Sequence, residues 1–172
     1  MERRKLVKNE PMDVLKDILD NLNDGIVIVD PSGQVVLFNN EALRIRKSIS
    51  DQPLTVGRHI TDFVPESRRV AVIDILKSIK RQKKSIRTSS EYRTCHGGSV
   101  FLETHFVPVL GSRRELKYVN IVSQDVTNRK LFEKKIRAAS ADFNNLLEQA
   151  HAIIFSVDSR GYVVDWNNHC VG

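Results

Sequence analysis

The stretch DGIVIVDPSGQVVLFNNEA, residues 24–42, decides the first part of the fold. Its two β-rich runs, Ile26 to Val29 and Val35 to Phe38, are joined by Asp-Pro-Ser-Gly, residues that favour turns. This pattern predicts a β-hairpin. Asn39 follows the second run, where its side chain can accept hydrogen bonds from first-turn amides, so we expect a short helix to begin there.

A second copy of this stretch, AIIFSVDSRGYVVDWNNHC, occupies residues 152–170. Gly33 and Gly161 stand 128 positions apart, and Asp30 matches Asp158 at the same offset. Matches without gaps at one offset indicate an internal repeat. The sequence therefore predicts one complete unit and the truncated start of a second. We expect the apolar strands of the second copy to pair with another chain or to lie against the complete unit.

Further helices and strands are predicted around the hairpin. Apolar residues at helical spacing predict a leading amphipathic helix over residues 12–22 and a long helix over 65–80, in which Val70, Ile73, Leu76 and Ile79 recur at steps of three. Three more β-rich runs, at 85–94, 100–109 and 116–124, are separated by glycine-containing turns and predict an antiparallel meander. Together these elements predict an α+β fold, a five-stranded antiparallel sheet with helices on one face and amphipathic flanking helices.

Charge and hydropathy exclude several classes of protein. The chain of 172 residues holds 27 Lys and Arg against 21 Asp and Glu, a formal charge of +6. The basic residues fall in short groups such as Arg68-Arg69, with no interleaved aromatic residues, so we expect solvated helix faces and loop tips and no nucleic-acid partner. No signal peptide and no membrane segment can be recognised, which favours a cytoplasmic location.

The order of elements and four local motifs resemble the PAS domain family. These motifs are VDPSGQVVLFNNEA at 29–42, GRHITDFVPE at 57–66, the turn at Gly97-Gly98 and QDVTNRK at 124–130. The resemblance implies an N-terminal extension at 1–11 and a complete PAS domain, including the leading helix, at 12–127. Residues 151–172 resemble the truncated start of a second PAS domain, which makes the chain part of a tandem sensory module.

Residues 128–150 are predicted to form a linker helix. Its apolar residues alternate steps of four and three, which is typical of a coiled coil, although such residues can also pack on their own domain. The predicted seam of the linker consists of Phe132, Ile136, Ala139, Phe143, Leu146 and Ala150. With Leu15, Leu19 and Leu22 of the leading helix, it predicts a homodimer that forms through the flanking helices. Asp125 and Thr127 can cap the linker helix and are predicted to relay a signal into it.

PAS domains bind haem, flavin, small organic acids, other ligands or nothing. No Cys lies in residues 58–64, which excludes cysteine-based flavin photochemistry, and His59 is expected to be exposed and not to bind haem. We therefore predict no cofactor and no metal, and a mainly apolar pocket suited to a small apolar ligand or to plain core packing. The ligand-pocket candidates are Ile28, Phe38, Phe63, Ile73, Leu76, Leu102, Thr104 and Phe106.

The sequence contains no catalytic constellation, so this chain is not predicted to be an enzyme. The expectation is a PAS sensory and dimerisation module that relays a change through its C-terminal helix to an output domain. The resemblance implies most often a histidine kinase of a two-component system. A transcriptional regulator, a cyclic-dinucleotide enzyme, a haem or flavin redox sensor and a nucleic-acid-binding fragment are the alternatives.

Overall fold

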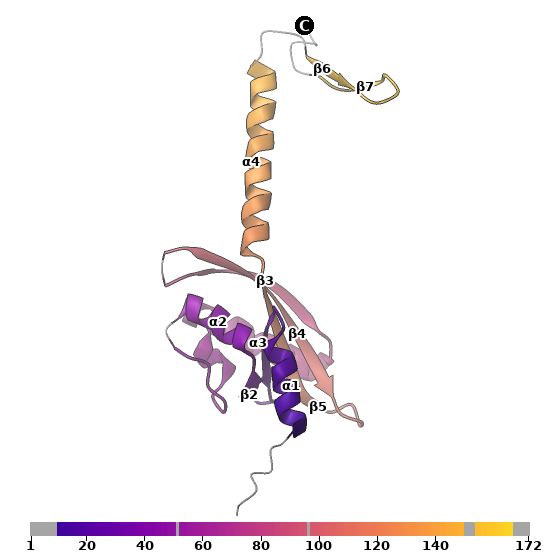
Figure 1. Ribbon diagram of the computed structural model, residues 1–172. Helices are drawn as coiled ribbons and strands as arrows, with labels where there is room; N and C mark the ends of the chain where they lie inside the picture. Colours follow the sequence, from indigo (N-terminus) through magenta and orange to yellow (C-terminus); the bar gives the residue numbers. More distant parts are fainter. Residues whose placement is uncertain (1–9, 51, 96, 150–153, 167–172) are drawn as a thin grey trace, which may run out of the picture. The chain divides into compact units, whose positions relative to one another are not determined.

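The chain is divided into two compact units, Met1–Thr127 and Asn128–Gly172. The computed structural model describes residues 10–50, 52–95, 97–149 and 154–166 (Figure 1). Most of the predicted N-terminal extension lies outside these ranges. Among the described residues, no helix combines the length and the apolar character that crossing a membrane requires.

A five-stranded antiparallel sheet forms the centre of the first unit. The strands are β1 (Gly25–Val29), β2 (Val35–Phe38), β3 (Ile86–Arg93), β4 (Ser99–Leu110) and β5 (Leu116–Asp125). Their order is β2-β1-β5-β4-β3, so the first hairpin joins the meander through pairing of β1 with β5. The predicted α+β fold with five antiparallel strands is confirmed.

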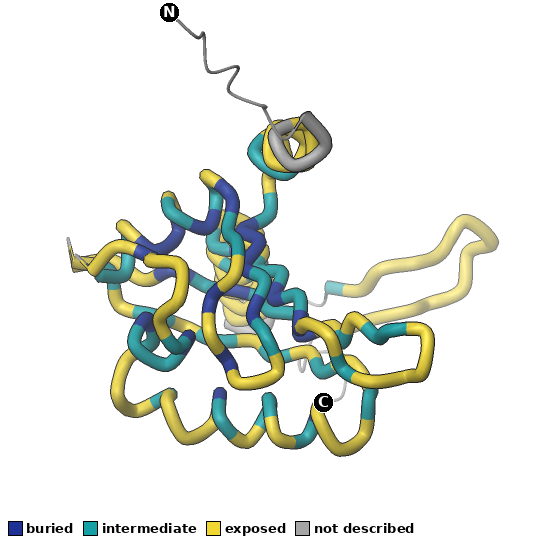
Figure 2. The backbone as a smooth tube through the Cα atoms, turned by 90° about the horizontal axis from the view of Figure 1, so that it is seen from below, coloured by how far each residue is buried: buried dark blue, intermediate teal, exposed yellow. Residues whose placement is uncertain are grey.

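One face of the sheet carries α2 (Asn40–Ile49), the 3-10 helix η1 (Ile60–Phe63) and α3 (Glu66–Gln82). Helix α2 packs next to β1, and α3 packs next to β4. Buried residues gather on the strands and on the sides of the helices that face them (Figure 2). The leading helix α1 (Glu10–Asp20) has no buried residue among those whose side chains are described.

Asn39 joins the leading helix, the first strand and α2. Asn39 is 1% exposed, and its Oδ1 accepts hydrogen bonds from the amides of Ile26 (2.8 Å) and Ala42 (3.0 Å). Its Nδ2 donates to the carbonyl oxygens of Leu19 (2.8 Å) and Asp24 (2.9 Å). The predicted cap is therefore present, and it does more than start α2, because the same amide group also holds the end of α1.

The second unit consists of α4, β6 and β7, with bounds Thr127–Gln149, Phe155–Val157 and Val163–Trp166. In the β6–β7 hairpin, Phe155 pairs with Trp166 and the register shifts after Ser156. The β1–β2 hairpin has the same register 128 positions earlier, with Val27 opposite Phe38 and a shift after Ile28. Both hairpins therefore share one geometry as well as one sequence pattern.

The apolar seam residues of α4 are exposed in the isolated chain. They lie along one continuous helix, as their spacing predicts. Phe132, Ile136, Ala139, Phe143 and Leu146 are all in the exposed class, and Ala150 lies outside the described residues. The strands β6 and β7 are exposed as well. Their predicted pairing with another chain or with the first unit stays a prediction.

Candidate functional site

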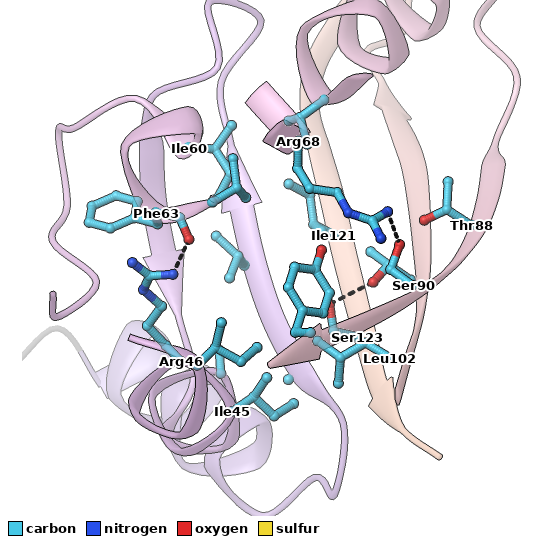
Figure 3. Close-up of a pocket in the computed structure, with 18 of the residues that line it drawn as sticks. Ile45, Arg46, Ile60, Phe63, Arg68, Thr88, Ser90, Leu102, Ile121 and Ser123 are labelled. Carbon is cyan, nitrogen blue, oxygen red and sulfur yellow. Dashed lines mark hydrogen bonds between the residues drawn. The ribbon is translucent and has the colours of Figure 1, made fainter. Parts of the chain in front are cut away.

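A cavity of about 170 Å³ lies between α2, η1, α3 and the inner face of the sheet (Figure 3). Four of the five strands of the sheet, β1, β3, β4 and β5, contribute to its lining. The apolar part of the wall includes Ile45, Ile60, Phe63, Val72, Leu102 and Ile121. A concave, largely apolar site with a few polar groups is the usual form of a small-molecule site.

One group of polar residues in the wall lies on α3 and β3. Arg68 Nη1 donates a hydrogen bond of 2.6 Å to Ser90 Oγ, and its guanidinium carbon lies 5.3 Å from the centre of the Tyr92 ring. That distance is within the range of a cation–π contact. Thr88 lies beside this group (Figure 3). The cavity is therefore less apolar than the sequence predicts, because a cation and hydroxyl groups line it.

Arg46 lies on the other side of the cavity and has a structural role. Its Nη1 donates to the carbonyl oxygen of Phe63, and its Nε donates to that of Gln52 at 3.0 Å. Burial lowers the pKa of the Arg46 guanidinium from its ordinary value. Two backbone carbonyls thus occupy this cation, which ties α2 to the segment around η1.

Four of the eight predicted pocket residues line the cavity, and four do not. Phe63, Leu102, Thr104 and Phe106 are in the wall. The residues outside it are Ile28, Phe38, Ile73 and Leu76. In β1, Val27 faces the cavity, and alternation along the strand directs Ile28 to the other face. In α3, Val72 and Ile75 face the cavity in place of Ile73 and Leu76. That any of these residues binds a ligand stays a prediction.

The sequence interpretation missed both cavity arginines, and it was wrong about Arg68, which is not on a solvated helix face. One signal was available for each of them. Arg68 precedes Val72 by four residues and Ile75 by seven, so the three share one side of α3. Arg46 follows Ala42 by four residues on the buried side of α2.

His59 is half-buried and caps η1, which corrects the expectation of an exposed side chain. Its Nδ1 lies 2.6 Å from Thr61 Oγ1 and accepts from the Thr61 amide at 3.2 Å. A Cβ atom on Gly33 would collide with its imidazole ring. His59 is not among the residues that line the cavity. Among the described residues, no group of three or more His, Cys, Asp and Glu side chains could hold a metal ion.

The segment Asp125–Thr127 connects the sheet to α4 by several hydrogen bonds. Thr127 Oγ1 accepts from the amide of Phe101 at 2.9 Å and donates to Asp125 Oδ1. The amide of Thr127 donates to the same carboxylate oxygen at 3.0 Å, and the Val126 amide donates to the Phe101 carbonyl at 2.8 Å. Arg44 of α2 lies 3.9 Å from the other oxygen of Asp125. Thr127, the first residue of α4, is thus held to β4, and Asp125 at the end of β5 is joined to α2 by an ion pair.

The antiparallel sheet, the helices on one of its faces and the cavity between them define a small α+β domain with an internal cavity. The family model of the PAS fold matches residues 19–131, more than half of the chain. The chain therefore belongs to the PAS fold family, whose domains are sensory and not catalytic.

Sequence comparison finds a curated relative, the sensor protein CitS of Halalkalibacterium halodurans. It is 25% identical over 130 residues, which are 76% of this chain and 24% of the relative. This chain thus spans about a quarter of the length of that relative.

Several solved structures have a similar fold. The PAS domain of BvgS from Bordetella pertussis has a TM-score of 0.56 and 19% identity, with 78% of this chain and 99% of that chain covered. The PAS domain of a protein from Colwellia psychrerythraea has a TM-score of 0.55 and 14% identity, with 69% of this chain and 98% of that chain covered. A sensory box histidine kinase/response regulator from Burkholderia thailandensis has a TM-score of 0.50 and 16% identity, with 78% of this chain and 98% of that chain covered. At these identities the likeness is one of fold.

Proposed function

We propose that the chain is a sensory module that binds a small ligand in its cavity and transmits the change through Asp125 and Thr127 into α4. The observation that carries this proposal concerns α2. Its Ile45 and Ile49 line the cavity, while its Arg44 forms the ion pair with Asp125. A ligand that moves α2 would therefore act on the start of α4.

The path from the cavity to α4 has a second branch through β4. Leu102, Thr104 and Phe106 line the cavity, and Phe101 at the start of the same strand donates its amide to Thr127. Helix and strand thus both connect the cavity wall to one short segment. A change in either would alter the hydrogen bonds of Thr127, which is the geometry a relay needs.

A histidine kinase is the output that we propose. The curated relative is named a sensor protein, and the same fold occurs in a sensory box histidine kinase/response regulator. The seam of exposed apolar residues on α4 supports a parallel dimer of linker helices, which is suited to carry the signal along the chain. The shared register of the two hairpins supports a second PAS domain that begins at residues 151–172.

A chimera tests the relay. Residues 1–149 would be fused, with the heptad spacing kept, to a kinase transmitter that has lost its own sensor, and autophosphorylation would be measured. We expect Thr127→Val to change the autophosphorylation rate several-fold, because it removes the hydroxyl that links α4 to β4. Thr127→Ser, which keeps that hydroxyl, serves as the matched control. Equal rates for the original chimera and Thr127→Val would refute the relay.

A further inference from the structure

Arg68 is a cation in the cavity wall whose charge is not matched. Its side chain is half-buried, and its contacts within the structure are the hydroxyl of Ser90 and the ring of Tyr92. Both of these groups are neutral. Among the residues that the structure describes, no carboxylate forms an ion pair with Arg68. Partly burying an unpaired charge is costly, so a compensating anion in the cavity would be favourable.

The geometry around Arg68 suits a carboxylate. A guanidinium has five N–H donors, and its planar fork binds the two oxygens of a carboxylate side by side. One donor is directed to Ser90, which leaves others for a ligand. Thr88 and Ser90 add hydroxyl groups at the same end of the cavity (Figure 3). These groups can donate to the carboxylate oxygens as well.

The remainder of the cavity limits the size and the charge of the ligand. Away from Arg68 the wall is mainly apolar, with Ile45, Leu102 and Ile121 in it. The hydroxyl groups of Thr104 and Ser123 also lie there, and they form a hydrogen bond of 3.2 Å with each other. A volume of about 170 Å³ is close to that of cavities of roughly 150 Å³ that accept benzene. The other arginine, Arg46, already donates to two backbone carbonyls. One carboxylate and an apolar body of about six carbons therefore fill the site.

We infer that the cavity binds a small monocarboxylate with an apolar body, and that Arg68 is the partner of its carboxylate. This inference rests on the proposed function, because it names the ligand class of the same cavity. It departs from the purely apolar ligand that the sequence suggests. Arg68 is then a ligand-binding residue, and Tyr92 holds its guanidinium in place.

Benzoate and benzamide provide the test, because they have nearly the same shape and differ in charge. Binding to the full chain would be measured by isothermal titration calorimetry and by amide chemical shifts. We expect benzoate to bind and benzamide to bind at least about tenfold more weakly, because the neutral amide cannot form the charge-assisted hydrogen bonds that a carboxylate forms with a guanidinium. Shift changes are expected at Arg68, Ser90 and Leu102.

Two arginine variants complete the test. Arg68→Gln is expected to weaken benzoate binding at least about tenfold and to leave benzamide binding unchanged. Arg69→Gln makes the same change of charge one residue further along, at an exposed position, and is expected to bind benzoate as the original chain does. If Arg68→Gln does not fold, the comparison of benzoate with benzamide on the original chain still decides.

Several results would overturn the inference. Equal affinities for benzoate and benzamide would show that the cavity selects shape and not charge, and would leave the proposed ligand sensor intact. Tighter binding of succinate than of benzoate would exclude an apolar monocarboxylate. No binding of benzoate or hexanoate at millimolar concentration would also overturn it. The two proposals can also fail separately. If benzoate binding depends on Arg68 but the Thr127→Val chimera shows no change in autophosphorylation rate, this inference is supported and only the relay is refuted.

Discussion

Arg44 and Asp125 form an ion pair that joins α2 to the end of β5, with 3.9 Å between Nη2 and Oδ2. Glu41 lies closer, since its Oε1 is 2.6 Å from the same nitrogen. The hydrogen bond to Glu41 is the main reason that the pKa of Arg44 is raised above its ordinary value. Because Arg44 is 63% exposed at its side chain, this pair contributes little to stability. Its proposed importance lies in the two elements that it connects.

Replacement of Arg44 by Gln should separate stability from signalling. The free energy of unfolding is expected to fall by less than about 1 kcal/mol, as is usual for exposed ion pairs. The change of hydrogen exchange in the first turn of α4 when a ligand fills the cavity should become smaller, because only the branch through β4 remains. Urea unfolding and hydrogen exchange check the two expectations. Lys47→Gln on the same helix is the control, and an unchanged exchange response in Arg44→Gln would contradict the proposed role of the pair.

Replacement of Thr127 by Val should loosen the contact between β4 and α4. The amide of Phe101 loses its acceptor, and Asp125 loses a hydroxyl donor. We expect a loss of about 1–2 kcal/mol in the free energy of unfolding and faster exchange of the Phe101 amide. Thr127→Ser keeps both hydrogen bonds and should behave as the original chain. Protection of the Phe101 amide that is the same in Thr127→Val would contradict the contact.

The hairpin and the caps could be predicted because their signals are local. Pro31, Gly33 and Asn39 have conformational or hydrogen-bonding preferences that act over a few residues, and the observed β1, β2 and α2 follow them. The lining of the cavity depends instead on which side of each element faces the sheet. Four consecutive apolar residues in β1 do not reveal that side, so the prediction chose Ile28 where Val27 faces the cavity.

The orientation of α3 illustrates the same limit in a helix. The predicted apolar side used steps of three residues from Val70, and such steps drift around a helix of 3.6 residues per turn. Val70 is 69% exposed, whereas Ile79 is fully buried. The observed inner side follows steps of three and four and includes Arg68, a residue type that apolar patterns pass over. Several sides of the helix carry a similar number of apolar residues, and tertiary packing decides which of them faces the sheet.

Replacement of Asn39 by Ala should destabilise the first unit strongly. It leaves the amides of Ile26 and Ala42 without their acceptor in a buried place and frees the end of α1. Unsatisfied buried groups cost about 1–3 kcal/mol each, so we expect a loss of about 3 kcal/mol or more in urea unfolding. Asn40→Ala, at the exposed next position, is the matched control. A loss below about 1 kcal/mol would contradict the role of Asn39 as the shared anchor.

Asp30 should make the stability of the hairpin depend on pH. Partial burial raises the pKa of its carboxyl. Hydrogen bonds from Ser32, Gln34 and Gly33 lower the pKa, and together they outweigh the effect of burial, so that the pKa lies below its ordinary value. The contribution to stability is therefore fully present above the unfolded pKa of about 4 and is lost as the pH falls through the folded pKa. We expect the advantage in melting temperature over Asp30→Asn to shrink below about pH 4. A difference that is constant from pH 7 to pH 3 would contradict this assignment.

The exposed apolar seam of α4 predicts the oligomeric state. Ile136 and Phe143 are seven residues apart, so they recur on one side of the helix and can pack against the same side of a second copy. The double variant Ile136→Glu with Phe143→Glu should shift the chain from dimer to monomer in sedimentation velocity, because it places charges in the seam. Ala138→Glu with Asn145→Glu adds the same charge about 200° around the helix and should leave the dimer intact. If the original chain is monomeric at its highest soluble concentration, the seam does not dimerise. If both double variants are monomeric, net charge and not seam packing controls the association.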